Sequence, residues 1–68
     1  MLGTIERLVE DRGFGFVRPN GYAKTIFFHV RDARALSWDA RLLNQRVEFE
    51  VAEDKQGREV ALNVRPAT

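Results

Sequence analysis

The chain has 68 residues, enough for one small domain, because a chain of this length buries only about 60% of the surface that its unfolded form exposes. No cysteine is present, which excludes disulfide bonds and thiolate metal sites and is typical of the reducing cytoplasm. Eleven lysines and arginines against ten aspartates and glutamates give a net charge of +1, far below that of proteins that hold duplex nucleic acid mainly through its phosphates.

Five short strands are predicted along the chain from alternating apolar residues and turn signals. They span residues 3–9, 14–19, 24–30, 46–53 and 59–64. Asn20-Gly21 predicts a hairpin between the second and third strands, and Gly57 predicts a turn between the fourth and fifth. In the last two strands the alternation places six apolar side chains inward: Val47, Phe49, Val51, Val60, Leu62 and Val64.

The long connection between the third and fourth strands covers residues 31–45, where the apolar residues predict one or two helical turns. Five short strands are too few for two well-packed sheets, whereas closure into a barrel removes the exposed sheet edges. The sequence therefore predicts an all-β fold, a five-stranded antiparallel β-barrel that residues 1–68 form as a single domain.

Aromatic residues recur on one face of the second and third strands. In GFGFV, residues 13–17, two phenylalanines alternate with small residues, and in IFFHV, residues 26–30, a phenylalanine and the histidine share one face. Because a hairpin makes these strands neighbours, four side chains are expected to form one open surface, the aromatic face: Phe14, Phe16, Phe27 and His29. An exposed apolar patch on so small a domain marks a binding site, and flat rings stack well on nucleobases.

Two other interpretations fit the same pattern. Phe14 and Phe16 would be core residues if Gly15 and Val17 faced outward. Alternatively, the aromatic face would dock a peptide or another subunit, and the barrel would be a protein-interaction module. The pattern alone leaves these alternatives open.

The two aromatic segments at this spacing resemble the paired RNA-binding motifs of the cold-shock domain family. The resemblance extends to GTI near the start of the chain, to RVEFEV in the fourth strand and to ALNV in the fifth. It implies an OB-type barrel that binds single-stranded RNA and DNA across its first three strands and acts as a nucleic-acid chaperone with low sequence specificity.

The resemblance assigns base stacking to the aromatic face and to Trp38, which falls where the family has an aromatic residue in the long loop. Three cations flank the face and are expected to meet phosphates: Arg12, Arg18 and Lys24.

The chain departs from the family pattern in its first strand, where the family has lysine, tryptophan and phenylalanine in succession. Glu6, Arg7 and Leu8 stand there instead, and Val30 occupies a place where an aromatic residue is common. Each stacked ring contributes about 1–3 kcal/mol per base, so these changes are expected to weaken binding. The guanidinium of Arg7 is able to stack on a base, although it is equally able to pair with Glu6 or Glu10.

Catalysis is not expected. With one histidine and no cysteine, a nucleophile and base pair would require His29 to meet Ser37 across a loop. No cofactor, metal site or small-molecule substrate is predicted, and charges at the N-terminus and the short apolar runs predict neither a signal peptide nor contact with a membrane. The expected protein is a cytoplasmic monomer whose partner is single-stranded RNA or DNA, which stacking does not distinguish.

Overall fold

The computed structural model describes residues 1–67, in which strands account for most of the regular structure. The strands are β1 (Leu2–Val9), β2 (Phe14–Pro19), β3 (Ile26–His29), β4 (Arg46–Glu53) and β5 (Glu59–Pro66). Three single-turn 3-10 helices connect them: η1 (Glu10–Arg12), η2 (Val30–Asp32) and η3 (Ala40–Leu42). The predicted strands at residues 14–19 and 46–53 have these bounds, and the helical turns expected in the long connection are of the tighter 3-10 type.

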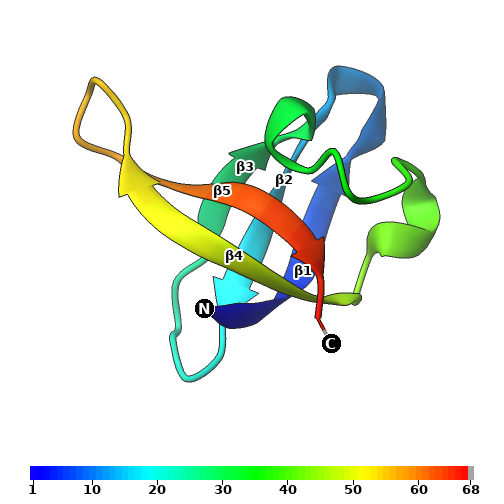
Figure 1. Cartoon of the computed structure of the whole chain (residues 1–68), viewed down its shortest axis with the longest axis horizontal. Helices are drawn as coiled ribbons and strands as arrows, with labels where there is room; N and C mark the ends of the chain where they lie inside the picture. The colour runs from blue at the N-terminus through cyan, green and yellow to red at the C-terminus, as the bar shows by residue number, and fades with distance from the viewer. Residues whose placement is uncertain (68) are drawn as a thin grey trace.

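The strands form a closed barrel in the order β1-β2-β3-β5-β4. The β4–β5 hairpin crosses in front of the β1–β3 sheet (Figure 1). The pairs β1–β2, β2–β3, β1–β4 and β4–β5 are antiparallel, and β3–β5, which closes the barrel through the pair Phe27 and Val60, is parallel. The predicted all-β barrel is confirmed, and the closing junction is its one departure from an antiparallel arrangement in the described residues.

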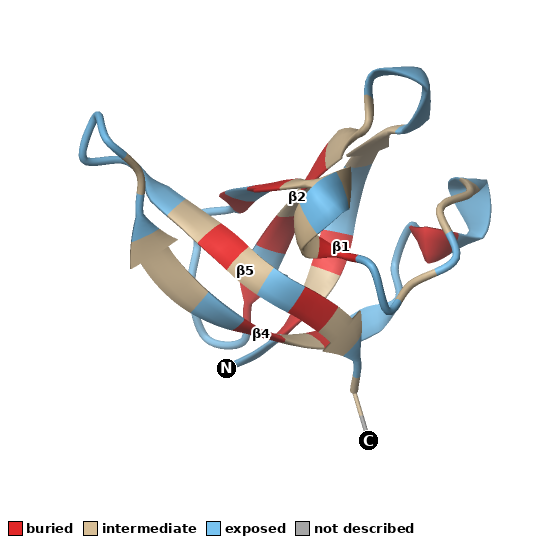
Figure 2. Ribbon diagram, turned by 45° about the horizontal axis from the view of Figure 1, so that its top comes forward, coloured by how far each residue is buried: buried red, intermediate tan, exposed pale blue. Residues whose placement is uncertain are grey.

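The core lies where the inward residues of all five strands meet, as the buried bands of Figure 2 show. Phe28 and Phe49 are the largest of its fully buried side chains, and smaller apolar residues fill the space around them: Ile5, Val17, Val47, Ala61 and Val64. Burying each large side chain contributes about 1.5–3 kcal/mol. Because Phe28 occupies the interior, its neighbour Phe27 has to point outward.

The alternation predicted for the fifth strand is wrong for Val60 and Leu62. The buried residues of β5 are Ala61 and Val64, whereas Val60 and Leu62 are only partly buried. Asn63 has a left-handed backbone with φ of 52°, and the register with β4 shifts at this point, so that two residues of β5 face one residue of β4. This bulge returns Val64 to the interior and turns Leu62 toward the surface.

The connection between β2 and β3 is longer than the tight turn that Asn20-Gly21 predicts. Tyr22 donates its backbone N–H to the carbonyl of Pro19 over 3.1 Å, with Gly21 at φ of 83°, and the chain then continues as an open loop to Ile26. The third strand is therefore shorter than predicted, and Lys24 lies in the loop. Within residues 1–67, no helix is both long and apolar enough to cross a membrane.

Candidate nucleic-acid interface

The structure brings the four side chains of the aromatic face together. In the register of β2 and β3, Phe14 lies opposite His29 and Phe16 lies opposite Phe27. The ring centroids of Phe14 and Phe27 are 5.5 Å apart, those of Phe16 and Phe27 are 5.9 Å apart, and those of Phe14 and Phe16 are 6.0 Å apart. Phe27 is the most exposed of these rings, at 37%. The three phenylalanines form one continuous apolar surface with His29 at its edge.

Gly15 explains why Phe14 and Phe16 are outside the core. A Cβ atom on Gly15 would lie 2.7 Å from the carbonyl oxygen of Arg7 and 3.0 Å from the ring of Phe28. Only glycine lets the β1 backbone and the core ring approach this closely. Gly15 and Val17 are buried, so the interpretation of Phe14 and Phe16 as core residues is wrong.

A bulge in β1 places two successive side chains on the outer surface. Ile5 pairs with Val17 and Arg7 pairs with Phe16, which leaves Glu6 as an extra residue between these pairs. Glu6 and Arg7 are therefore both exposed, whereas Leu8 turns inward and packs against the core. Leu8 therefore contributes to the packing of the core and not to the outer surface that carries the aromatic face.

Arg7 and Glu6 make different contacts. The guanidinium carbon of Arg7 lies 5.9 Å from the ring centroid of Phe16, within the range of a cation–π interaction. The carboxylate of Glu6 forms a 2.8 Å ion pair with Arg18 across the β1–β2 hairpin. Arg7 thus extends the aromatic face with a flat cation, while much of the charge of Arg18 is compensated by Glu6.

His29 has its ring orientation fixed by the turn that follows it. Its Nδ1 atom accepts the backbone N–H of Arg31 over 3.1 Å, capping η2. A ring nitrogen that accepts a hydrogen bond carries no proton, so the neutral imidazole has its proton on Nε2. His29 therefore offers a ring face for stacking and one N–H donor.

Trp38 is not part of the cluster on β2 and β3. Its ring packs edge-on against the core ring of Phe28, with centroids 5.9 Å apart, and its indole N–H donates to the carbonyl of Glu10 over 3.0 Å. The indole thereby connects the long loop to the end of β1. Local sequence patterns do not predict this contact, because Trp38 and Glu10 are far apart in the chain and come together only in the folded barrel.

The two remaining predicted phosphate contacts, Arg12 and Lys24, lie in different parts of the fold. Arg12 is exposed in η1, directly before β2. Lys24 borders a shallow pocket together with Met1 and Tyr22 and is not brought to the phenylalanine cluster. Val30, which occupies a place where an aromatic residue is common in the family pattern, lies on η2 and donates its backbone N–H to the carbonyl of Gly13 over 2.8 Å.

Residues of the β4–β5 hairpin border the aromatic face as well. Shallow grooves beside Phe27 are lined on their far side by Asp54, Arg58 and Val60. Asp54 accepts backbone N–H groups of Arg58 and Gln56 and pairs with the Arg58 guanidinium at 3.1 Å; the hydrogen bond from the Arg58 backbone is the main cause that lowers the pKa of Asp54. No pattern in the sequence indicates these residues, because the parallel contact between β3 and β5 that places them here joins distant parts of the chain.

A closed five-stranded barrel with clustered rings on two adjacent strands is the architecture of an OB-type domain that binds single strands. A family model described as the "'Cold-shock' DNA-binding domain" matches residues 1–67. The chain is 33% identical to a cold shock-like protein of Aquifex aeolicus, over 93% of this chain and 89% of that protein. It is 31% identical to the probable cold shock protein A of Mycolicibacterium smegmatis, over 81% of this chain and 82% of that protein.

A third relative is the cold shock-like protein CspG of Escherichia coli, which is 30% identical over 84% of this chain and 81% of that protein. The chain therefore belongs to the cold-shock domain family, whose members bind single-stranded nucleic acids. The resemblance seen in the two aromatic segments is confirmed, and so is the OB-type barrel that it implies.

Proposed function

We propose that this protein binds single-stranded RNA or DNA by stacking bases on Phe14, Phe16, Phe27 and His29. The observation that carries the proposal is the cluster of phenylalanine rings on the outer surface of β2 and β3, with centroids 5.5 to 6.0 Å apart. Aromatic stacking contributes about 1–3 kcal/mol per base, and a face of this size accommodates about four to seven nucleotides.

Arg7 takes part as a flat cation beside Phe16. A guanidinium stacks on a base face and attracts the neighbouring phosphate, so it replaces part of what a ring would contribute at this place. Arg12 and Arg18 border the face as phosphate contacts, the second weakened by its ion pair with Glu6. Lys24 is a peripheral contact for a strand that extends over the β2–β3 loop.

Trp38 has a mainly structural role in this proposal. Its N–H is already donated to Glu10, and its ring supports Phe28 beneath the sheet. Trp38 would contact the ligand only if the nucleic acid extends from the aromatic face as far as the long loop between β3 and β4.

The biological action proposed is that of a passive RNA chaperone. A protein that holds unpaired bases shifts RNA toward its open forms by mass action, without nucleotide hydrolysis or any other catalysis. In this proposal the protein acts in the cytoplasm as a monomer and needs neither a cofactor nor a small-molecule substrate.

The stacking model is tested with the double variant Phe16→Ala, Phe27→Ala. Loss of two stacks is expected to weaken the binding of a fluorescein-labelled seven-nucleotide oligothymidylate, measured by anisotropy, by at least about 30-fold. Tyr22→Ala is the matched control, because Tyr22 is an exposed aromatic residue, at 59%, outside the cluster. It is expected to leave the affinity unchanged.

Three outcomes contradict the model: unchanged affinity in a folded double variant, equal losses in the control, or wild-type binding of a matched duplex as tight as that of the single strand. The fold of each variant is checked by circular dichroism. Wild-type affinity for the single strand is also expected to fall with rising salt, because contacts to phosphates release counterions. A surface that docks apolar peptides would instead show almost no salt dependence.

A further inference from the structure

The cations of this barrel differ in whether a carboxylate neutralises them. Arg18, Arg41, Arg58 and Arg65 each form an ion pair with a nearby aspartate or glutamate. Among the described residues 1–67, by contrast, no ion pair joins a carboxylate to Arg31 or Arg34, and both side chains are exposed. Their charges are available to an external anion.

The backbone holds these two arginines at the His29 end of the aromatic face. The N–H of Arg31 donates to Nδ1 of His29 over 3.1 Å, and the N–H of Val30, one residue earlier, donates to the carbonyl of Gly13, which directly precedes β2. Ala33, next to Arg34, is buried and donates its N–H to the carbonyl of Val30 over 3.0 Å. The chain positions of both arginines are therefore set by the folded barrel, although their side chains are long.

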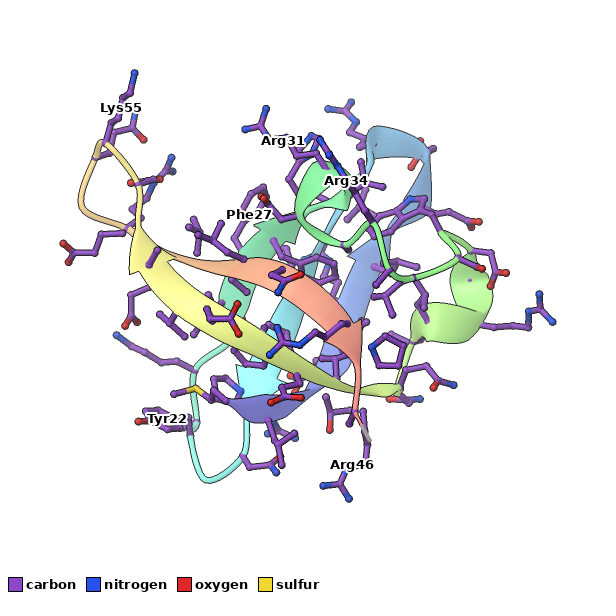
Figure 3. The ribbon with its side chains drawn as sticks, viewed as in Figure 1. Tyr22, Phe27, Arg31, Arg34, Arg46 and Lys55 are labelled. Atoms are coloured by element: carbon purple, nitrogen blue, oxygen red, sulfur yellow. The ribbon has the colours of Figure 1, made fainter. Side chains whose placement is uncertain are left out.

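Two shallow grooves connect these arginines with the aromatic face. One is lined by Phe27, His29, Arg31 and Leu62, among others, and the next by Arg31, Arg34, Leu62 and Asn63. The grooves share Arg31 and Leu62, so they are neighbours and together form a path that leads from the rings toward β5. Leu62 lies in this path because the bulge in β5 turns it toward the surface. Figure 3 shows Arg31 and Arg34 at one end of the barrel and Arg46 at the other.

Acidic side chains limit where a phosphate fits along this path. Asp32 lines both grooves, and Glu53 and Asp54 line the one nearer Phe27, where Arg58 pairs with Asp54. The charged residues that line the second groove are Arg31 and Arg34, which are positive, and Asp32, which is negative. The favourable place for a phosphate is consequently the far groove, between Arg31 and Arg34.

We propose that a single strand stacked on the aromatic face continues past His29 and is held through its phosphates by Arg31 and Arg34. The inference rests on the proposed function and adds a direction to it: strands longer than the face leave the barrel at this end. An arginine pair suits the task, because each guanidinium presents a planar fork of donors to phosphate oxygens.

The test compares two labelled oligothymidylates, of four and of twelve nucleotides, with wild type and the variant Arg31→Gln, Arg34→Gln. Affinity for the twelve-nucleotide strand is expected to fall about tenfold, and the slope of log affinity against log salt by about 1.4, since each phosphate contact on a single strand contributes roughly 0.7. Affinity for the four-nucleotide strand is expected to stay within about twofold, because that strand fits on the rings.

The matched control is Arg46→Gln, Lys55→Gln, which removes the same charge from two exposed cations that line neither groove (Figure 3). Equal losses in the control, equal losses for both strand lengths, or an unchanged twelve-nucleotide affinity would each overturn the assignment. As a second measurement on the wild type, the side-chain Nε–H signals of Arg31 and Arg34 are expected to shift with the longer strand only, whereas the Arg31 backbone amide, which is bonded to His29, is expected to shift with both strands. Wild type that binds neither strand would instead reject the proposed function itself.

Discussion

Arg7 and Glu6 show how two adjacent side chains modify the aromatic face in opposite ways. Arg7 lies over Phe16 as a flat cation, whereas Glu6 brings a negative charge to the same surface and pairs with Arg18. The sequence identified both departures from the family, but it did not reveal their partners. The reason is the bulge in β1, which places both side chains outward and which alternation with a period of two does not anticipate.

Replacing Glu6 with glutamine is expected to tighten binding of a single strand. The change removes an anion from the face and releases Arg18 from its ion pair, an effect of up to about 1 kcal/mol for exposed groups, or at most about fivefold in affinity. Anisotropy titrations at low and high salt measure it, and the gain is expected to shrink as salt rises.

Glu48→Gln is the control for general charge, because Glu48 pairs with Arg65 on the β4–β5 side of the barrel. If both variants gain equally, the effect comes from net charge and not from the position of Glu6 on the face.

Among the elements, β2 and β4 were predictable and β5 was only partly so. In β2 and β4 regular alternation matches the burial of Val17, Val47 and Phe49. In β5 the left-handed residue Asn63 interrupts the alternation, and no local pattern in the sequence marks it as such. The position of Phe27 beside Val60 was also unpredictable, because it depends on closure between strands that are far apart in the chain.

The bulge in β5 is tested by comparing Asn63→Val with Asn63→Gly. Both variants lose the 3.3 Å hydrogen bond from Asn63 to Glu50, so their difference isolates the cost of a β-branched residue at φ of 52°. The free energy of unfolding of the valine variant, measured with urea, is expected to be about 1–2 kcal/mol lower than that of the glycine variant. Equal stability of the two would mean that β5 is not bulged at this residue.

At the scale of the whole molecule, carboxylates that pair with arginines make stability depend on pH. Hydrogen bonds from the Arg41 side chain lower the pKa of Asp39, those from the Arg65 side chain lower the pKa of Glu50, and the Arg58 backbone does the same for Asp54. Each carboxyl therefore binds its proton at a lower pH in the folded state than in the unfolded state.

Stability is consequently expected to decline on acidification. The ordinary pKa values of these groups are 3.8 for aspartate and 4.5 for glutamate, so the contribution is complete above about pH 5 and is lost as the pH falls through the lower values of the folded state. Melting temperatures between pH 7 and pH 2.5 at fixed ionic strength measure this. A melting temperature that stays level or rises toward pH 3 would contradict it, and Asp54→Asn is expected to flatten the dependence.

The closing junction of the barrel has a consequence for how the molecule opens. β3 and β5 are joined by the single registered pair Phe27 and Val60, whereas six pairs join β1 to β2. Local opening events are expected to begin at this seam, so its amide protons are expected to exchange with deuterium sooner than those between β1 and β2. A nucleic-acid strand bound on Phe27 and against the β4–β5 hairpin would contact both sides of the β3–β5 junction from outside the barrel. Ligand binding is then expected to slow amide hydrogen exchange most at the β3–β5 junction, where the free protein opens most easily. The ligand would thus stabilise the closed barrel at its weakest junction.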